Sequence, residues 1–147
     1  MASDMEKNKN YIELKFYHFD ILHKELTELI KLTPTHFWVI GDNYKIGPPN
    51  RNGERIRTSN FWCFDKFAET NENLGDLVEE FIDNVIVLRI QEIKSLTEKY
   101  HGEFSVVQYM YEGCNPGFCL SKNHIDILSK CGLALNIDFY VLSESSV

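Results

Sequence analysis

The sequence predicts an α+β fold, with helices packed on one face of a mostly antiparallel sheet of about five strands. Segments in which apolar and polar side chains alternate, such as residues 11–19, indicate half-buried strands. Segments with apolar side chains at helical spacing, such as residues 22–30, indicate amphipathic helices. Strands follow one another both through short turns and through helical crossovers, and this mixture favours the α+β class.

The length and composition fit one domain. The chain has 147 residues, of which 44% are apolar and 25% charged, as is ordinary for a globular protein. The single domain is predicted to span residues 11–143. A disordered polar tail is expected at residues 1–10 and a short C-terminal tail at residues 144–147.

The net charge of −7 narrows the partners that the protein can bind. An acidic chain lacks the basic surface that binds a nucleic-acid backbone, and an anionic membrane repels it. The N-terminal residues form no apolar signal segment, and no apolar run is long enough to span a bilayer. We therefore expect a cytoplasmic protein that binds neither nucleic acid nor membrane and keeps its four cysteines reduced.

The first strand and the first helix are predicted over residues 11–30. The two faces of the strand differ, with Ile12, Leu14 and Phe16 on an apolar face and Glu13, Lys15 and Tyr17 on a polar one. The helix follows Asp20 and carries an apolar stripe made by Leu22, Leu26, Leu29 and Ile30. Pro34 ends it, because proline disfavours helical geometry in the residue before it.

Residues 43–60 are predicted to form a long loop or an irregular hairpin, because they are rich in proline and glycine and have almost no periodicity. The segment is locally basic, with Lys45, Arg51, Arg55 and Arg57 against Glu54 alone. A short apolar segment, residues 37–40, precedes it and ends in a Gly41-Asp42 turn. A strand rich in aromatic rings, residues 61–67, follows it.

A long helical stretch is predicted next. It starts at Asn73 or Asp76, resumes over residues 90–100, and bends over residues 85–88, whose β-branched side chains suit a helix interior poorly. His101-Gly102 is predicted to end it.

The remaining elements are expected in this order: a strand at 104–111, a turn at 112–117, a short strand at 118–120, a helix from Ser121 to Gly132, and a strand at 135–142. A strand followed by a helix occurs in both 12–30 and 118–131, which fits a decayed duplication. A ferredoxin-like arrangement also fits the order of elements.

Four stretches in this order carry a family likeness: ELTELIKLTPTHFWVIGD at 25–42, FW at 61–62, the acidic helical stretch, and LSKNHIDILSKCGLALNIDFYVLS at 120–143. Together they resemble the domain of unknown function 4279 family of bacteria, over roughly residues 11–143. The resemblance implies a small stand-alone bacterial cytoplasmic protein and supplies no catalytic residues. Some small bacterial families of this kind serve as immunity proteins beside toxin genes.

The sequence contains no set of residues for metal binding or catalysis. Cys114, Cys119, His124 and Cys131 are close in the sequence. In the predicted helix, however, His124 and Cys131 lie about 10 Å apart along the axis, too far to share one zinc ion. Cys63 lies on an apolar strand, where a thiol is usually inert. We therefore expect a protein that is not an enzyme and that uses no metal and no cofactor.

The acidic stretch gives the leading functional hypothesis. Its six candidate contact residues are Glu69, Glu72, Asp76, Glu79, Glu80 and Asp83. Such a charged surface steers oppositely charged partners, although an acidic helix can also be a solvated face with no partner. The hypothesis is a non-enzymatic, immunity-type protein that binds and neutralises a cognate toxin, because many toxins that act on nucleic acid are cationic.

The alternative hypothesis is a sensor or binding domain for a small anionic ligand. Two tryptophans flank the basic loop, and the candidate binding residues are Trp38, Asp42, Lys45, Arg51, Arg55, Arg57 and Trp62. Aromatic walls with a few charged groups are typical of ligand pockets. Rings at such spacing, however, more often belong to the hydrophobic core.

Overall fold

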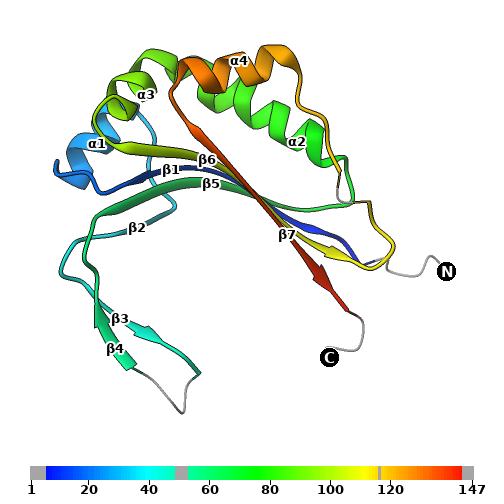
Figure 1. Ribbon diagram of the computed structural model, residues 1–147, viewed down its shortest axis with the longest axis horizontal. Coiled ribbons are helices and arrows are strands. Elements are labelled where there is room, and N and C mark those ends of the chain that lie inside the picture. Colours follow the sequence, from blue (N-terminus) through cyan, green and yellow to red (C-terminus); the bar gives the residue numbers. More distant parts are fainter. Residues whose placement is uncertain (1–5, 49–52, 116, 144–147) are drawn as a thin grey trace.

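The computed structural model describes residues 6–48, 53–115 and 117–143, which fold into an α+β domain, as predicted. Within these ranges, five strands form a sheet in the order β2-β5-β1-β6-β7, and all helices cover one face of it (Figure 1). The strands are β1 (Lys9–Tyr17), β2 (His36–Trp38), β5 (Phe61–Glu69), β6 (His101–Tyr111) and β7 (Ala134–Leu142). The α-helices are α1 (His23–Ile30), α2 (Leu74–Phe81), α3 (Ile90–Thr97) and α4 (Lys122–Lys130).

The central strand β1 is antiparallel to both of its neighbours, β5 and β6. It begins two residues before the predicted strand, so the boundary of the predicted tail at residue 10 is wrong. The Asn10 side chain is fully buried and hydrogen-bonds with Ala68 and Gln108, which extends the sheet in this direction. The strand ends at Tyr17 because His18 adopts a positive φ of 58°. His18 is exposed, whereas the alternation placed it on the buried face.

The last strand, β7, runs parallel to β6, and α4 makes the crossover between them. The other pairs in this sheet are antiparallel, so the sheet is mostly antiparallel. The short strand predicted at residues 118–120 does not form. Phe118 and Leu120 instead pack on the edge of the core, and Cys119 passes close to Gly75 of α2.

This topology corrects two finer expectations. The suggested duplication lacks the strand of its second unit. A ferredoxin-like arrangement does not form either, because both neighbours of β1 in the sheet, β5 and β6, are antiparallel to it, whereas a split β-α-β unit needs a parallel neighbour.

The helical stretch between β5 and β6 begins at the predicted cap. The Asn73 side chain accepts a hydrogen bond from the backbone N–H of Asp76. The bend predicted at 85–88 corresponds to a π-helical turn (Ile82–Ile86) followed by a 3-10 turn (Val87–Arg89). His101-Gly102 does not stop the helix but belongs to β6. A Cβ on Gly102 would meet Thr97 at 2.6 Å, so this glycine permits close packing rather than a turn.

The basic segment forms the irregular hairpin that was one of its two predicted forms. Strands β3 (Asn43–Ile46) and β4 (Gly53–Ile56) pair with each other and project from the main sheet on the side away from the helices (Figure 1). Gly41 takes a φ of +94° at the base of the hairpin, which glycine adopts without strain.

The hydrophobic core lies between the sheet and the helices. It includes Leu14, Phe16, Trp62 and Phe104 from the sheet, which are all fully buried. In α1 only half of the predicted stripe is buried, since Leu26 and Ile30 face the core whereas Leu22 and Leu29 remain exposed. None of the helices in the described ranges has the length and apolar character that crossing a membrane requires.

Candidate functional site

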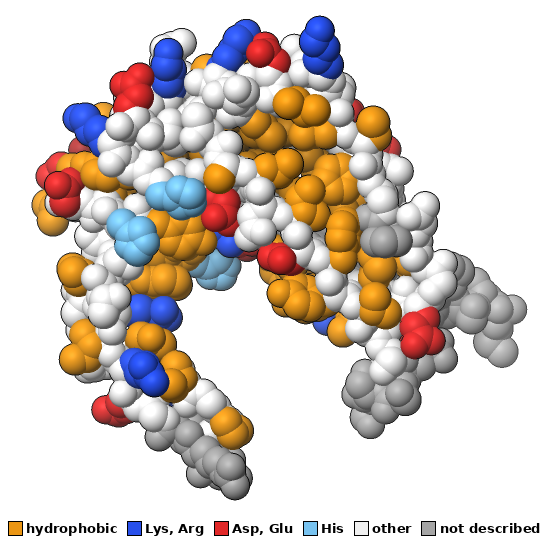
Figure 2. Space-filling view, viewed as in Figure 1, with side chains coloured by type: hydrophobic (Ala, Val, Ile, Leu, Met, Phe, Trp, Pro, Cys, Tyr) orange, Lys and Arg blue, Asp and Glu red, His pale blue; other side chains and the backbone are white. Residues whose placement is uncertain are grey.

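The face of the sheet opposite the helices is the candidate functional site, and we call it the open face. Strand alternation and register assign to it the odd-numbered residues of β1, β5 and β6 and the even-numbered residues of β2 and β7. No helix of the described chain covers it. Figure 2 shows the molecule arched over this side, with the β3–β4 hairpin bordering the hollow.

Aromatic rings extend across the open face from strand to strand. Tyr11 of β1 contacts Phe67 of β5 at a ring-centroid distance of 4.9 Å and lies 6.2 Å from Tyr109 of β6. Tyr109 in turn stacks on Tyr140 of β7 at 5.0 Å. This end of the open face is therefore a row of partly exposed rings.

A charged cluster lies beside these rings. The Lys15 ammonium is 3.3 Å from the Glu13 carboxylate, and the Cys63 thiol donates a hydrogen bond of 3.4 Å to the same carboxylate. The side chains of Lys15 and Glu13 are only 15% and 14% exposed. The opposite charges of Lys15 and Glu13, both on β1, are thus held against the sheet.

Two further carboxylates on the open face each contact a histidine. His36 Nε2 is 3.2 Å from Asp65 Oδ2, and His101 Nε2 is 3.6 Å from Glu103 Oε2. The carboxylate side chains are mostly buried, whereas both histidine side chains are more than half exposed. The outer surface of these pairs is therefore the imidazole ring.

The groups on the open face that could act as nucleophiles are held in protonated forms. Burial and the Glu13 carboxylate raise the pKa of the Cys63 thiol. Burial also raises the pKa of Tyr17. Burial on its own would lower the pKa of Lys15, but the interactions with Glu13, Tyr17 and Cys63 together outweigh burial, so the pKa is raised. A thiol, a phenol and an ammonium group in these forms suit hydrogen bonding rather than nucleophilic attack.

Two cavities open on this face and share Glu13 and His36. The larger, of about 520 Å³, also contacts Lys15, Trp38 and Cys63. The smaller, of about 230 Å³, lies between Tyr11, Asp65 and Tyr109. Both contain rings and charged groups that come from different strands, as in ligand and partner sites.

The two tryptophans do not line one pocket, so the predicted pairing of Trp38 with Trp62 is wrong. Trp38 lies on the open face and stacks on Phe61 at 4.1 Å. Trp62 lies on the helix side with no exposed surface, and its Nε1–H donates to Thr27. Neighbouring positions along a strand point to opposite faces, and Trp62 belongs to the core.

Of the other predicted ligand-binding residues, Arg57 joins Trp38: its guanidinium lies 3.7 Å from the centre of the Trp38 ring. Lys45 and Arg55 are exposed on the hairpin strands. Asp42 accepts a hydrogen bond from the backbone N–H of Val39 and closes the predicted turn. Arg51 lies outside the described residues.

The predicted acidic residues do not form one free surface. Glu69, Glu72, Asp76 and Glu80 are exposed near α2. Glu79 of α2 and Asp83 of the π-helical turn after it contact His124 of α4, with Asp83 at 2.9 Å and Glu79 at 3.7 Å, although the Asp83 side chain remains exposed. These two residues connect the helical stretch to α4.

The four residues that resemble a metal site in the sequence do not come together in the structure. His124 uses one ring nitrogen for Asp83 and the other for Ser121, and Cys131 is fully buried. Cys114 and Cys119 are exposed. Within the described ranges, no group of three His, Cys, Asp or Glu side chains could hold a metal ion.

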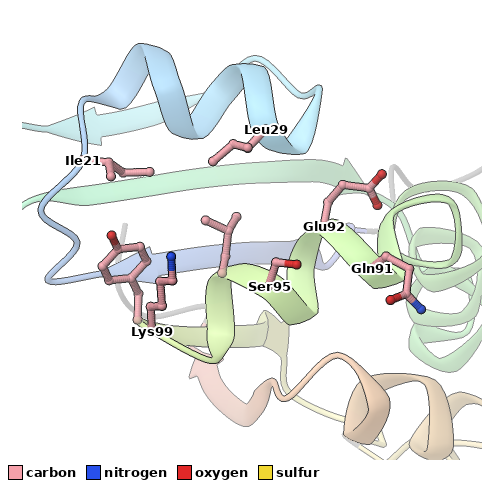
Figure 3. A pocket seen from close by; sticks show the side chains of 8 residues that line it. Ile21, Leu29, Gln91, Glu92, Ser95 and Lys99 are labelled. Atoms are coloured by element: carbon pink, nitrogen blue, oxygen red, sulfur yellow. The ribbon is translucent and has the colours of Figure 1, made fainter.

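A separate cavity of about 340 Å³ lies in the helical layer between α1 and α3 (Figure 3). Its walls are apolar and include Ile21, Leu29 and Leu96. Its polar lining groups, such as Glu92 and Lys99, come from α3 and the residues just after it. It therefore lacks the convergent polar groups from several elements that the open face provides.

A family model described as Domain of unknown function (DUF4279) matches residues 8–142. The chain belongs to the DUF4279 family. No curated protein and no solved structure matches the chain. The DUF4279 match runs from the start of β1 to the end of β7, so the family domain includes both the open face and the hairpin.

Sequence reasoning missed most of the open face as a site in this DUF4279 domain. The available signal was the polar side of β1, where Glu13, Lys15 and Tyr17 alternate with core residues. His36 and Asp65 contact each other although they are 29 residues apart in the sequence. Their proximity depends on the pairing of β2 with β5, which no local pattern indicates.

Proposed function

We propose that the protein is a non-enzymatic, immunity-type binding protein that holds a basic protein, such as a cognate toxin, against its open face. The observation that carries the proposal is the row of partly exposed rings formed by Tyr11, Tyr109 and Tyr140 on an uncovered sheet. Tyrosine and tryptophan are enriched in protein interfaces, because they bury a large area at a small cost in side-chain entropy.

Charge supports a basic partner. Strand alternation assigns more carboxylates than ammonium groups to the open face: Glu13, Asp65, Glu69, Glu103 and Asp138 against Lys9 and Lys15. The whole chain has a net charge of −7. A cationic partner would be attracted from a distance and then meet acceptors on the sheet.

The rival surface for the same function is the acidic helix α2. It keeps some support, since Glu72, Asp76 and Glu80 are exposed and close together in the sequence. It offers few rings, however, and two of its six predicted contact residues already bind His124. Exposed charges of this kind steer association more than they hold a complex together.

The test is co-purification with the products of the adjacent genes, using the wild type and two surface variants. The open-face variant is Tyr109→Ala with Tyr140→Ala. The matched helix variant is Glu72→Lys, Asp76→Lys and Glu80→Lys, which leaves the His124 contacts intact. We expect the open-face variant to weaken a complex more than tenfold and the helix variant mainly to slow association at low salt.

The opposite pattern would place the partner on α2. Normal circular dichroism of both variants is the control for folding. A complex that survives both sets of substitutions with unchanged affinity would contradict the proposed surface, and the absence of any complex with a protein would count against the function itself.

The second candidate function, the binding of a small anion, retains one supporting observation. Arg57 is held between two rings at the border of the open face. That observation concerns a defined chemical group rather than the whole surface.

A further inference from the structure

The backbone of Arg57 is fixed at the base of the β3–β4 hairpin. Its N–H donates to the carbonyl of Asp42 at 2.7 Å, and its carbonyl accepts from the N–H of Gly41 at 2.8 Å. Asp42 in turn accepts from the N–H of Val39 through its side chain. The backbone that carries the Arg57 side chain is therefore hydrogen-bonded through both its N–H and its carbonyl.

The Arg57 guanidinium lies between two aromatic rings. Its Cζ is 3.7 Å from the centre of the Trp38 ring and 3.8 Å from the centre of the Tyr44 ring. Trp38 itself stacks on Phe61, with an angle of 22° between the ring planes. Both flat faces of the guanidinium are thus covered, which leaves its edge, the side that carries the N–H donors.

Among the residues that the structure describes, no carboxylate or carbonyl accepts a hydrogen bond from the donors of the Arg57 guanidinium. Arg89 shows the contrasting arrangement, because its guanidinium donates to the carbonyls of Ile30, Val85 and Lys31 at 2.9–3.2 Å. The Arg89 guanidinium connects helical segments through its hydrogen bonds, whereas the Arg57 guanidinium is positioned by rings and can donate to a ligand.

The charge around the Arg57 guanidinium favours an anion. Arg55 lies on β4, two residues before Arg57, and is opposite Tyr44 in the hairpin register. Strand alternation therefore puts Arg55 on the same face of the hairpin as Tyr44. The nearby carboxylate of Asp42 accepts a hydrogen bond from a backbone N–H and forms no ion pair with Arg57.

We propose that the Trp38–Arg57–Tyr44 stack is an oxyanion-binding site, in which the guanidinium edge donates hydrogen bonds to two oxygens of a carboxylate or phosphate group. A guanidinium matches such a group with two parallel N–H···O hydrogen bonds, and stacking reduces the freedom that binding must remove. The site extends the proposed function, because it names one group that a partner or ligand would present to the hairpin side of the hollow.

The experiment is an NMR titration of the ¹⁵N-labelled protein with sodium acetate and, separately, with inorganic phosphate, each against sodium chloride of equal ionic strength. The chain has two tryptophans, and Trp62 is fully buried, so Trp38 supplies an indole N–H signal at the surface. We expect the Trp38 indole N–H and the Arg57 Nε–H signals to shift and saturate with acetate or phosphate but not with chloride. The tighter of the two anions identifies the group.

Two variants sharpen the titration. Arg57→Lys keeps the charge but removes the planar fork, and it should weaken binding at least tenfold. Lys122→Arg, the reverse exchange at an exposed position of α4, is the control and should leave binding within about twofold of the wild type. Shifts that are linear, that follow ionic strength alone, or that persist in Arg57→Lys would overturn the proposal. Since the titration needs no protein partner, its failure would leave the proposed function standing.

Discussion

The two faces of the five-stranded sheet are built from the same strands but differ in how far their side chains are buried. On the helix side, Phe16, Trp62 and Phe104 are fully buried and make contacts only within the domain. On the open face, Tyr17, Tyr109 and Tyr140 keep part of their surface exposed. Alternation along a strand thus separates the buried side chains of the core from the partly exposed side chains of the open face, so those on one face can change with little effect on the other.

The largest expected effect comes from removing a ring on the helix side. Trp62→Ala should lower the free energy of unfolding by about 3–5 kcal/mol, because it leaves a cavity in a packed core and a Thr27 hydroxyl without its donor. Urea denaturation followed by circular dichroism measures this. A loss no greater than that of the open-face substitution below would erase the contrast between the two faces.

The next effect is a pH dependence that comes from the helix side. Burial raises the pKa of the Cys131 thiol from its ordinary 9.0 to about 11. Above pH 9 the unfolded chain ionises this thiol while the folded chain keeps it protonated. The contribution of this thiol to the free energy of unfolding is therefore fully present below pH 9. As the pH rises towards 11, the free energy of unfolding falls by at most about 3 kcal/mol.

The measurement compares urea denaturation of the wild type and of Cys131→Ala at several pH values from 8 to 11. Both proteins share every other titrating group, so the difference between their plots of unfolding free energy against pH isolates this thiol. Parallel plots would mean that Cys131 is not shielded from water.

A smaller loss is expected at the end of the sheet. Asn10→Ala should destabilise the domain by about 1–3 kcal/mol, because it leaves the buried Gln108 amide and the Ala68 carbonyl without a partner. Thermal unfolding followed by circular dichroism tests this. Asn136→Ala, an exposed amide on β7, is the matched control and should change the stability by less than about 0.5 kcal/mol.

The smallest effect is expected on the open face. Tyr140→Ala should cost less than about 1 kcal/mol of stability, since half of its side chain is exposed and it loses mainly one stacking contact with Tyr109. If this substitution unfolds the protein in urea as readily as Trp62→Ala does, the open face is a second core rather than a recognition surface.

Much of the fold could be predicted because local chemistry determines it. The alternation in β1 indicates its two faces, and Asn73 and Ser121 cap their helices as their side chains predict. The pairing of β2 and the parallel partnership of β6 with β7 depend on contacts between distant segments, which a local pattern does not contain. The closeness of Gly102 to Thr97 likewise exists only in the packed state.

The candidate site was less predictable for a related reason. In the strand that begins at Phe61, both faces are apolar, so alternation cannot assign Trp62 to the core or to a pocket. The acidic residues of this helical stretch are close together in sequence, but the contacts of Glu79 and Asp83 with His124 depend on α4, which follows about 40 residues later.

The central position of β1 has a consequence for synthesis of the chain. β1 is complete at Tyr17, but its partner in β6 begins at His101, 84 positions later. At roughly 5–20 residues per second, a ribosome needs about 4–17 seconds to make that interval. Until then β1 can pair only with β5, its edge towards β6 stays unpaired, and a nascent chain stalled before β6 would be a substrate for chaperones or proteases.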